Sequence, residues 1–92
     1  EIAAVVHETT RRLGVSLVIN DRVDVMLAVD AEGVHVGSDD LPADRVRTLA
    51  PGKILGCSVG SFEELRRAEA AGADYIGIGP VFPTPTKADA GP

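Results

Sequence analysis

The sequence is poor in aromatic residues and has no excess of basic ones. It contains one tyrosine, two phenylalanines and no tryptophan, and its 9 Lys and Arg are outnumbered by 14 Asp and Glu. A nucleic-acid-binding surface needs a basic stripe for the phosphates or aromatic rings on which bases can stack. The composition therefore argues against nucleic acid as a partner.

Long apolar runs and paired cysteines are also missing. Apolar residues come in bursts of about five, whereas a membrane-spanning helix needs about 20. No charged segment precedes a short apolar one, as it would in a signal peptide. The single cysteine, Cys57, has neither a disulfide partner nor Cys and His companions at metal-site spacing. These features predict no association with a membrane and favour a cytoplasmic protein.

Four short, β-rich apolar runs recur about every twenty residues. They cover residues 16–20, 33–37, 53–58 and 74–79, and they are mostly apolar throughout rather than alternating. Continuous apolar strands separated by helical segments indicate a parallel sheet that is covered on both faces.

The segment after the third run has the clearest helix signals. Residues 61–64 (SFEE) form a capping box, in which the serine and the glutamate each satisfy a free backbone N–H. The spacing predicts that Phe62, Leu65 and Ala68 form the buried stripe of this helix. Gly72 is its natural end.

Three further helices are expected. In the first, Ile2, Val5, Val6 and Leu13 form an apolar face before Gly14, and His7 falls on the polar side. A short, weakly polar helix covers residues 23–31. The next begins at Pro42 and cannot continue past Pro51. Its inward-facing residues are predicted to be Val46, Leu49 and Ala50.

The resulting order is α-β-α-β-α-β-α-β, followed by an irregular tail from residue 80. This order predicts an α/β fold. Uniform strand direction and short repeats favour the TIM (β/α)8 barrel over a doubly wound sheet, in which functional residues would gather at one switch point. The chain would then supply a partial barrel of about four parallel strands with intervening helices.

Polar residues follow each apolar run. Asn20 and Asp21 follow the first, Asp39 and Asp40 the second, Ser58 ends the third, and the fourth runs into residues 79–87 (GPVFPTPTK). In a parallel barrel all of these positions share the face that holds the active site. Taken one at a time, Asp and Ser are also ordinary helix N-caps, so that interpretation remains open for each residue alone.

As a set, these residues suit a hard cation and phosphate oxygens. Mg²⁺ prefers one or two carboxylates together with substrate phosphates. Lys87 offers a point charge, and hydroxyl donors come from Ser58, Thr84 and Thr86. The sequence therefore predicts binding of a phosphorylated small molecule with Mg²⁺.

Four segments together resemble the thiamine phosphate synthase family. They are residues 17–24 (LVINDRVD), 33–37 (GVHVG), 39–42 (DDLP) and 79–87 (GPVFPTPTK), of which the last is the most specific. The resemblance spans essentially the whole chain. It implies a Mg²⁺-dependent transferase of thiamine biosynthesis, which joins hydroxymethylpyrimidine pyrophosphate to thiazole phosphate and releases pyrophosphate.

The resemblance also implies roles for individual residues. The magnesium ligands would be Asp21 and Asp40, the contacts to the pyrimidine pyrophosphate Asn20, Ser58 and Lys87, and the contacts to the thiazole phosphate Thr84 and Thr86. In the dissociative reaction of the family, pyrophosphate leaves before the thiazole nitrogen attacks. Lys87 and Ser58 would then be catalytic, because they stabilise charge on the departing group.

The family pattern further implies that residues 1–92 are the central segment, about strands 3 to 6, of a single (β/α)8 domain whose flanking strands are absent. Such a segment should be inactive alone. Its uncovered strand edges and faces predict a homo-oligomer, most simply a dimer. Two other functions stay open: a thiazole tautomerase, which needs no metal and is disfavoured by Asp21 with Asp40, and a non-catalytic phosphate-binding barrel fragment.

Two further residues invite a functional role. His35 lies in the middle of its strand and lacks metal-site companions, so we expect it to be packed or hydrogen-bonded. Cys57 has no base or cation adjacent in sequence, which favours a small apolar filler over a nucleophile.

Overall fold

The computed structural model describes residues 2–37 and 39–79. Helices and strands alternate through these residues, as the sequence predicts, and every expected element is present. In chain order they are α1 (Ile2–Leu13), β1 (Val18–Asn20), α2 (Val23–Val29), β2 (Gly33–Val36), α3 (Ala43–Leu49), β3 (Ile54–Val59), α4 (Phe62–Ala70) and β4 (Tyr75–Ile78).

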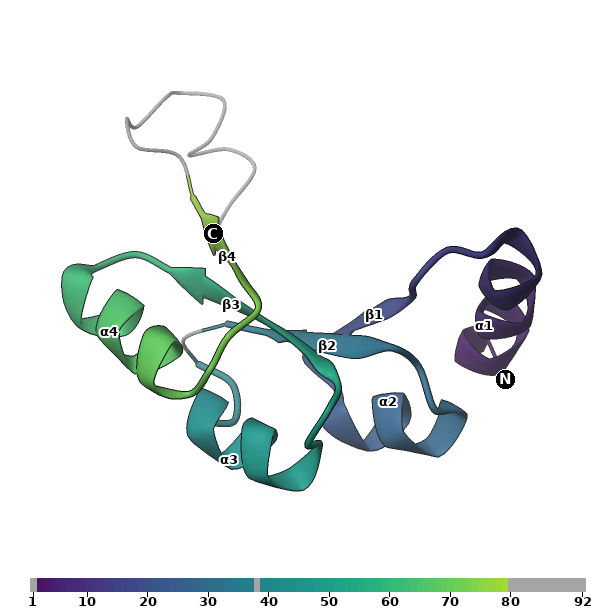
Figure 1. Cartoon of the computed structure of the whole chain (residues 1–92), viewed down its shortest axis with the longest axis horizontal. Helices are drawn as coiled ribbons and strands as arrows, with labels where there is room; N and C mark the ends of the chain where they lie inside the picture. Colours follow the sequence, from purple (N-terminus) through teal and green to yellow (C-terminus); the bar gives the residue numbers. More distant parts are fainter. Residues whose placement is uncertain (1, 38, 80–92) are drawn as a thin grey trace.

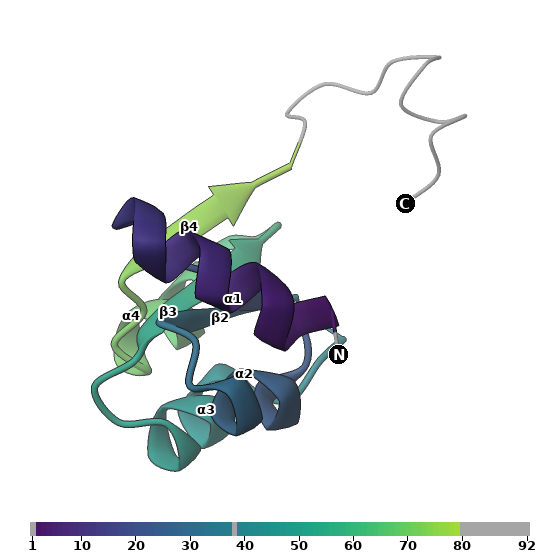
Figure 2. The same ribbon diagram turned by 90° about the vertical axis from the view of Figure 1, so that its right-hand side faces the viewer.

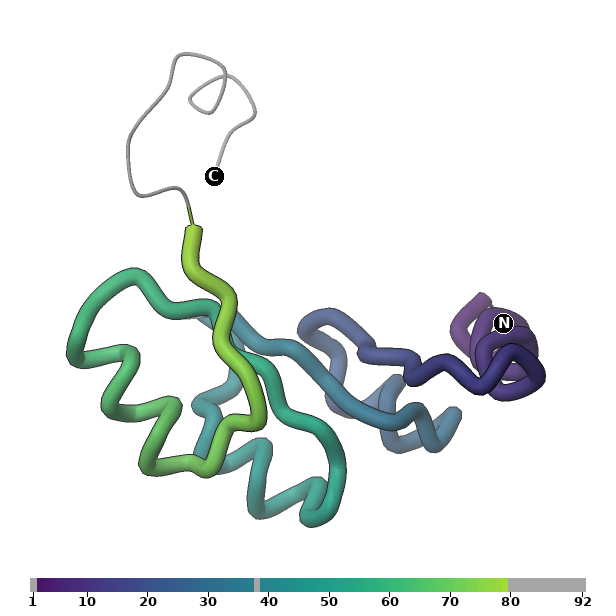
Figure 3. Tube along the Cα trace, turned by 45° about the horizontal axis from the view of Figure 1, so that its top comes forward, coloured from purple at the N-terminus to yellow at the C-terminus, as the bar shows by residue number. Residues whose placement is uncertain are grey.

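The four described strands form one parallel sheet in the order β1-β2-β3-β4. Figures 1 and 3 show the strand–helix units advancing side by side in chain order. Strands that follow one another without a reversal of order are typical of a barrel, because a doubly wound sheet reverses at its switch point. The topology thus supports the barrel class predicted from the sequence.

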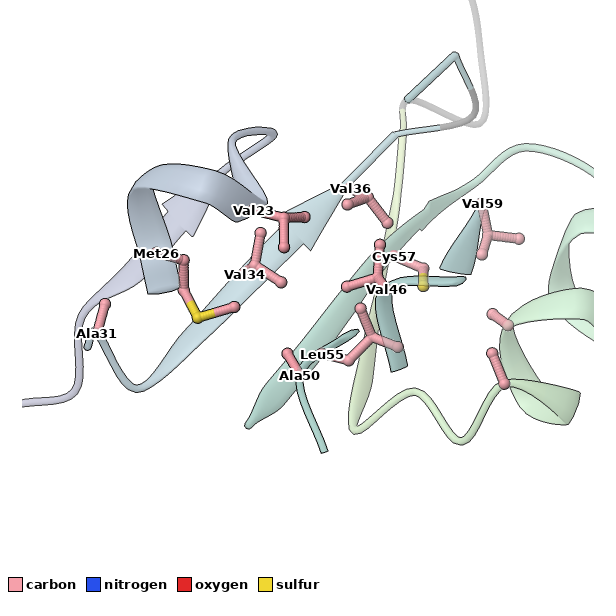
Figure 4. Close-up of a cluster of buried hydrophobic side chains, with 12 residues drawn as sticks. Val23, Met26, Ala31, Val34, Val36, Val46, Ala50, Leu55, Cys57 and Val59 are labelled. Atoms are coloured by element: carbon pink, nitrogen blue, oxygen red, sulfur yellow. The ribbon is translucent and has the colours of Figure 1, made fainter. Parts of the chain in front are cut away.

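Helices cover one face of this sheet. In Figure 1, α2, α3 and α4 lie on the same side of the strands, and the core forms between them and the sheet. Met26, Val34, Val46 and Leu55 are its largest fully buried side chains, and Figure 4 shows them meeting there. In the described part of the chain no helix covers the opposite face, so the prediction of cover on both faces is wrong for this part.

Strand alternation explains which residues occupy the bare face. Successive side chains of a strand point to opposite sides. Val34 and Val36 of β2 are buried in the core, so His35 between them points to the bare face. In β3, Leu55 and Cys57 are buried and Ser58 is exposed. The face without helices is therefore the face that carries polar groups.

Helix α1 differs from its prediction. Ile2 and Leu13 are 81% and 70% exposed, Val5 and Val6 are also exposed, and the buried residue is His7. Helix α1 packs beside α2 and lies at the β1 edge of the sheet in Figure 1. Figure 2, seen from that side, shows α1 in front of the strands. His7 turns toward this contact because its Nδ1 donates to the carbonyl of Val29 at 2.8 Å and its Nε2 lies 3.0 Å from Glu32 Oε2.

Helix α4 begins with the predicted capping box, except that Glu64 accepts from the N–H of Gly60 and not from that of Ser61. Ser61 Oγ accepts from the N–H of Glu64 at 3.1 Å, and Glu64 Oε1 accepts from the N–H of Gly60 at 2.6 Å. The helix ends at Ala70, and Gly72, two residues later, has the left-handed φ of 78° that glycine favours.

The predicted buried stripes of α4 and α3 are each wrong at one position. Phe62 is 81% exposed, whereas Ala68 is buried and Leu65 half-buried. At 3.6 residues per turn, Phe62 lies about 120° around the helix from Ala68, which places it beside the stripe. In α3, Val46 and Ala50 are buried but Leu49 is 54% exposed. None of the described helices is long and apolar enough to cross a bilayer.

Candidate functional site

The ends of three strands bring the predicted site residues to one edge of the sheet. Asn20 is the last residue of β1 and Asp21 follows it, Asp40 lies in the loop after β2, and Ser58 lies near the end of β3. Because the strands are parallel, these positions meet at the same edge. The structure thus places together the predicted site residues of its described part.

Asp21 and Asp40 approach each other closely. The N–H of Asp21, at a φ of 78°, donates to the carbonyl of His35 at 2.7 Å, which fixes the residue against β2. Its carboxyl group makes a side-chain hydrogen bond with Asp40. Asp40 Oδ2 also accepts from the N–H of Gly37 at 2.6 Å. Residues nineteen positions apart in the sequence therefore form one acidic pair.

The two carboxyl groups have opposite pKa shifts. The hydrogen bond with Asp40, followed by desolvation and repulsion between the carboxylates, raises the pKa of Asp21. The same hydrogen bond, followed by the Gly37 N–H, lowers the pKa of Asp40. One proton shared by two carboxylates is the usual result when like charges are held together. A divalent cation bound by the pair would relieve the same repulsion.

The N-cap interpretation of these residues is wrong. Arg22 and Pro42 occupy the N-cap positions of α2 and α3 without a side-chain capping bond, and Ser61 caps α4. Asp21, Asp40 and Ser58 are therefore not helix caps. Their proximity needs another explanation.

A second polar cluster lies on the bare face of the sheet. His35 Nε2 lies 2.8 Å from Ser58 Oγ, and His35 Nδ1 lies 3.0 Å from the hydroxyl of Tyr75. The hydrogen-bonded role predicted for His35 is confirmed. Ser58 is one of the predicted site residues, so the structure adds His35 and Tyr75 as candidate site residues that sequence reasoning missed.

The strand register explains how this cluster forms. Asn20 pairs with His35, His35 with Gly56, and Gly56 with Tyr75, so these residues make one row across the sheet. Paired residues share a face, and Ser58 lies two residues beyond Gly56 on that same face. The alternation of side chains along β2 and β3 was the signal that could have identified His35, because it places His35 and Ser58 on the same face of the sheet.

The chemistry of the acidic pair fits magnesium better than a transition metal. The described residues contain no group of three or more His, Cys, Asp or Glu side chains that could hold a metal ion. Asp21 and Asp40 offer two carboxylates, which suits Mg²⁺ because it keeps several waters and takes further oxygens from substrate phosphates. The predicted phosphate-contacting residues Thr84, Thr86 and Lys87 lie outside the described residues.

A pocket of about 390 Å³ lies beside the pair. Its lining includes Asp40, Pro42, Cys57, Ser58 and Arg67, from the ends of β2 and β3 and from α3 and α4. Cys57 is buried within the core, and burial raises the pKa of its thiol. Its burial agrees with the predicted packing role of Cys57.

The fold and the site together define the class: a segment of a parallel (β/α) barrel with two carboxylates and a hydroxyl at the C-terminal ends of its described strands. Comparison with known families gives a match of residues 1–92 to the family described as thiamine monophosphate synthase. The chain belongs to this family.

Individual relatives agree with that membership. The chain is 60% identical to a thiamine-phosphate synthase of Caldanaerobacter subterraneus over 98% of its length, and 54% identical to one of Syntrophomonas wolfei over 100%. It spans 42% and 44% of these two relatives. Among solved structures, thiamine phosphate pyrophosphorylase from Pyrococcus furiosus matches with a TM-score of 0.81 and 47% identity, over 90% of this chain and 41% of that one.

Proposed function

We propose that this chain carries part of the active site of a thiamine phosphate synthase. The whole protein would join hydroxymethylpyrimidine pyrophosphate to thiazole phosphate, giving thiamine phosphate and pyrophosphate. The observation that carries the proposal is the acidic pair of Asp21 and Asp40, held beside Ser58 at the strand ends. The names of the relatives support the same reaction.

Asp21 and Asp40 are the proposed magnesium ligands. When bound, Mg²⁺ would neutralise charge on the pyrophosphate and so make it a better leaving group. The pair is preorganised for this, because the Asp21 N–H is tied to β2 and the Asp40 carboxylate to Gly37. The same acidic pair argues against a tautomerase that needs no metal.

Asn20, Ser58 and Lys87 would contact the pyrimidine pyrophosphate, and Thr84 and Thr86 the thiazole phosphate. If pyrophosphate leaves first, the chain supplies no nucleophile. Its residues stabilise charge on the departing group, with Lys87 as cation and Ser58 as hydroxyl donor. They also hold the two substrates in line.

The length of the relatives suggests what covers the exposed apolar surfaces of this segment. Residues 1–92 would be the central part, about strands 3 to 6, of one (β/α)8 domain. Ile78 of β4 is 68% exposed and Ile2 of α1 81%, and the further strands and helices of a closed barrel would pack on both ends. The segment alone should then be inactive, and a cytoplasmic location remains a prediction.

The proposal is tested by assaying the whole protein that contains this segment with both substrates. We expect thiamine phosphate and pyrophosphate in a 1:1 ratio, and no product when a chelator removes Mg²⁺. Product formation that persists with the chelator would contradict the metal site. Absence of any product in the presence of Mg²⁺ would favour the non-catalytic phosphate-binding alternative.

A further inference from the structure

The side chain of Tyr75 reaches across a whole strand to the site. Tyr75 belongs to β4 and His35 to β2, with β3 between them. The rings nevertheless lie with their centroids 5.5 Å apart and tilted by 33°. The Tyr75 hydroxyl lies 3.0 Å from His35 Nδ1.

Gly56 makes this reach possible. It occupies β3 between the two rings in the register. A Cβ added at Gly56 would collide with Cζ and the hydroxyl of Tyr75. The ring of Tyr75 thus fills the place where any other residue would put its side chain, and the absence of a Cβ at position 56 creates the path to His35.

His35 links Tyr75 to Ser58, and the neutral ring can do so in two ways. A neutral imidazole has one N–H donor and one bare nitrogen acceptor. In the first arrangement Tyr75 donates to Nδ1 and the Nε2–H donates to Ser58 Oγ. In the second, Ser58 donates to Nε2 and the Nδ1–H donates to Tyr75. The distances of 3.0 and 2.8 Å fit either direction.

The two arrangements differ in what Ser58 offers a ligand. In the first, Ser58 Oγ accepts from His35 and its own O–H is free to donate. In the second, the hydroxyl proton is used on His35, and the oxygen presents only lone pairs. Ser58 is exposed, and within the described residues its side chain has no hydrogen-bond partner other than His35. An anion requires a donor, so a phosphate contact selects the first arrangement.

We propose that Tyr75 is a positioning residue, which reaches across β3 over Gly56 to hold His35 with its proton on Nε2, so that the hydroxyl of Ser58 donates outward to a bound phosphate. The proposal rests on the proposed function for the Ser58 contact. Three hydrogen bonds aligned in one direction also strengthen one another. Tyr75 itself touches no substrate in this account.

The first test reads the position of the proton directly. The chain is labelled with ¹⁵N-histidine, and two-bond ¹H–¹⁵N NMR spectra are recorded at about pH 8, above the ordinary titration range of imidazole. We expect His35 to be the Nε2–H tautomer. Tyr75→Phe keeps the ring but removes the donor, so the Nε2–H fraction should fall. A ring with its proton on Nδ1 or on both nitrogens, or an unchanged tautomer ratio in Tyr75→Phe, would overturn the proposal.

Gly56→Ala provides a second variant with a different disturbance. It should displace the Tyr75 ring and lower the Nε2–H fraction in the same way. Gly60→Ala is the matched control, because its added Cβ would meet only Glu64 Oε1 at 3.4 Å. The signals of His7, which lies far from β4 between Val29 and Glu32, report that each variant is folded. Equal tautomer ratios in the two glycine variants would count against the proposal.

A second measurement separates this proposal from the proposed function. The affinity for inorganic pyrophosphate with Mg²⁺ is measured by calorimetry in the whole protein that contains this segment, for the unmodified protein, Tyr75→Phe and Ser58→Ala. We expect both variants to bind about three- to tenfold more weakly, the effect of one hydrogen bond. Weaker binding by Ser58→Ala alone would overturn the role of Tyr75. An unchanged affinity in Ser58→Ala would overturn the phosphate contact of the proposed function, whereas the tautomer result would still stand.

Discussion

At the scale of single residues, the two histidines have different roles because they occupy different positions on a helix and on a strand. His7 is buried at the contact of α1 with α2 and bonds to Val29 and Glu32. His35 projects to the bare face of the sheet, beside Ser58 and Tyr75. The position of His35 follows from alternation along β2, so the sequence contained the necessary signal. The contact with Tyr75 depends on pairing across three strands, which no local pattern reveals.

The two phosphate sites predicted from the sequence can be separated by kinetics in the active whole protein. Lys87→Ala should lower turnover by about 100-fold or more, because the lysine is assigned to pyrophosphate, whose charge grows as it leaves. Thr84→Val with Thr86→Val should instead raise KM for thiazole phosphate by about tenfold with a smaller loss of turnover, because that phosphate keeps its charge during the reaction. Initial rates with each substrate varied separately provide the comparison.

The opposite pattern would show that the two phosphate assignments are exchanged. That pattern is a change only in KM for thiazole phosphate with Lys87→Ala, or a loss of turnover at unchanged KM with the threonine pair.

Glu32 should make folding stability depend on pH. The Leu17 N–H at 2.6 Å, and then His7, lower the pKa of Glu32 to about 2 from 4.5. A lowered folded-state pKa stabilises the fold above the unfolded value and loses this effect as the pH falls through about 4.5 toward about 2. Glu32→Gln should therefore reduce the free energy of unfolding near pH 7 by about 1 to 2 kcal/mol. It should also reduce the loss of unfolding free energy between about pH 4.5 and about pH 2. Urea denaturation at a series of pH values measures both effects.

Glu63→Gln is the matched control for this prediction. Glu63 pairs with Arg67 at 3.0 Å on the surface of α4, where both side chains are largely exposed, and exposed pairs contribute little. If the unfolding free energies of Glu32→Gln and Glu63→Gln fell equally with pH below about 4.5, the stabilising role of Glu32 would be contradicted.

At the scale of helices and strands, the element order could be predicted because its signals are local. Capping at Ser61 and the stop at Gly72 depend on neighbouring residues, and both are found in the structure. Which face a helix buries is a different question, since it depends on what packs against the helix. The exposed Phe62 and Leu49 show this limit. The proximity of Asp21 and Asp40 could be predicted, because parallel strands end at the same edge of a sheet.

Helix α4 should depend on its cap. Ser61→Ala removes the acceptor for the N–H of Glu64 and should lower the free energy of unfolding by about 1 kcal/mol. Ser16→Ala, at an exposed serine outside the helices and strands, is the control and should have little effect. Urea denaturation followed by circular dichroism measures both, and equal stabilities of the two variants would argue against the cap.

At the scale of the whole molecule, the main feature of the described residues is apolar surface that no other element covers. One face of the sheet carries no helix in the described part, and apolar residues of α1 and β4 are exposed. We therefore predict that the 92-residue chain associates in solution, as a dimer in the simplest case. Light scattering should give twice the mass of one chain. A stable, well-folded monomer at low concentration would contradict this prediction.

The central claim is that Asp21 and Asp40 form a magnesium site for the departure of pyrophosphate. Asp40→Asn in the active whole protein measures it most directly, with Asp39→Asn, the same change at the exposed neighbouring residue, as control. Because a neutral amide is a poorer ligand for Mg²⁺, Asp40→Asn should lower turnover by at least about 100-fold and remove its Mg²⁺ dependence. Asp39→Asn should keep both. Wild-type turnover and an unchanged Mg²⁺ titration curve in Asp40→Asn would contradict the account.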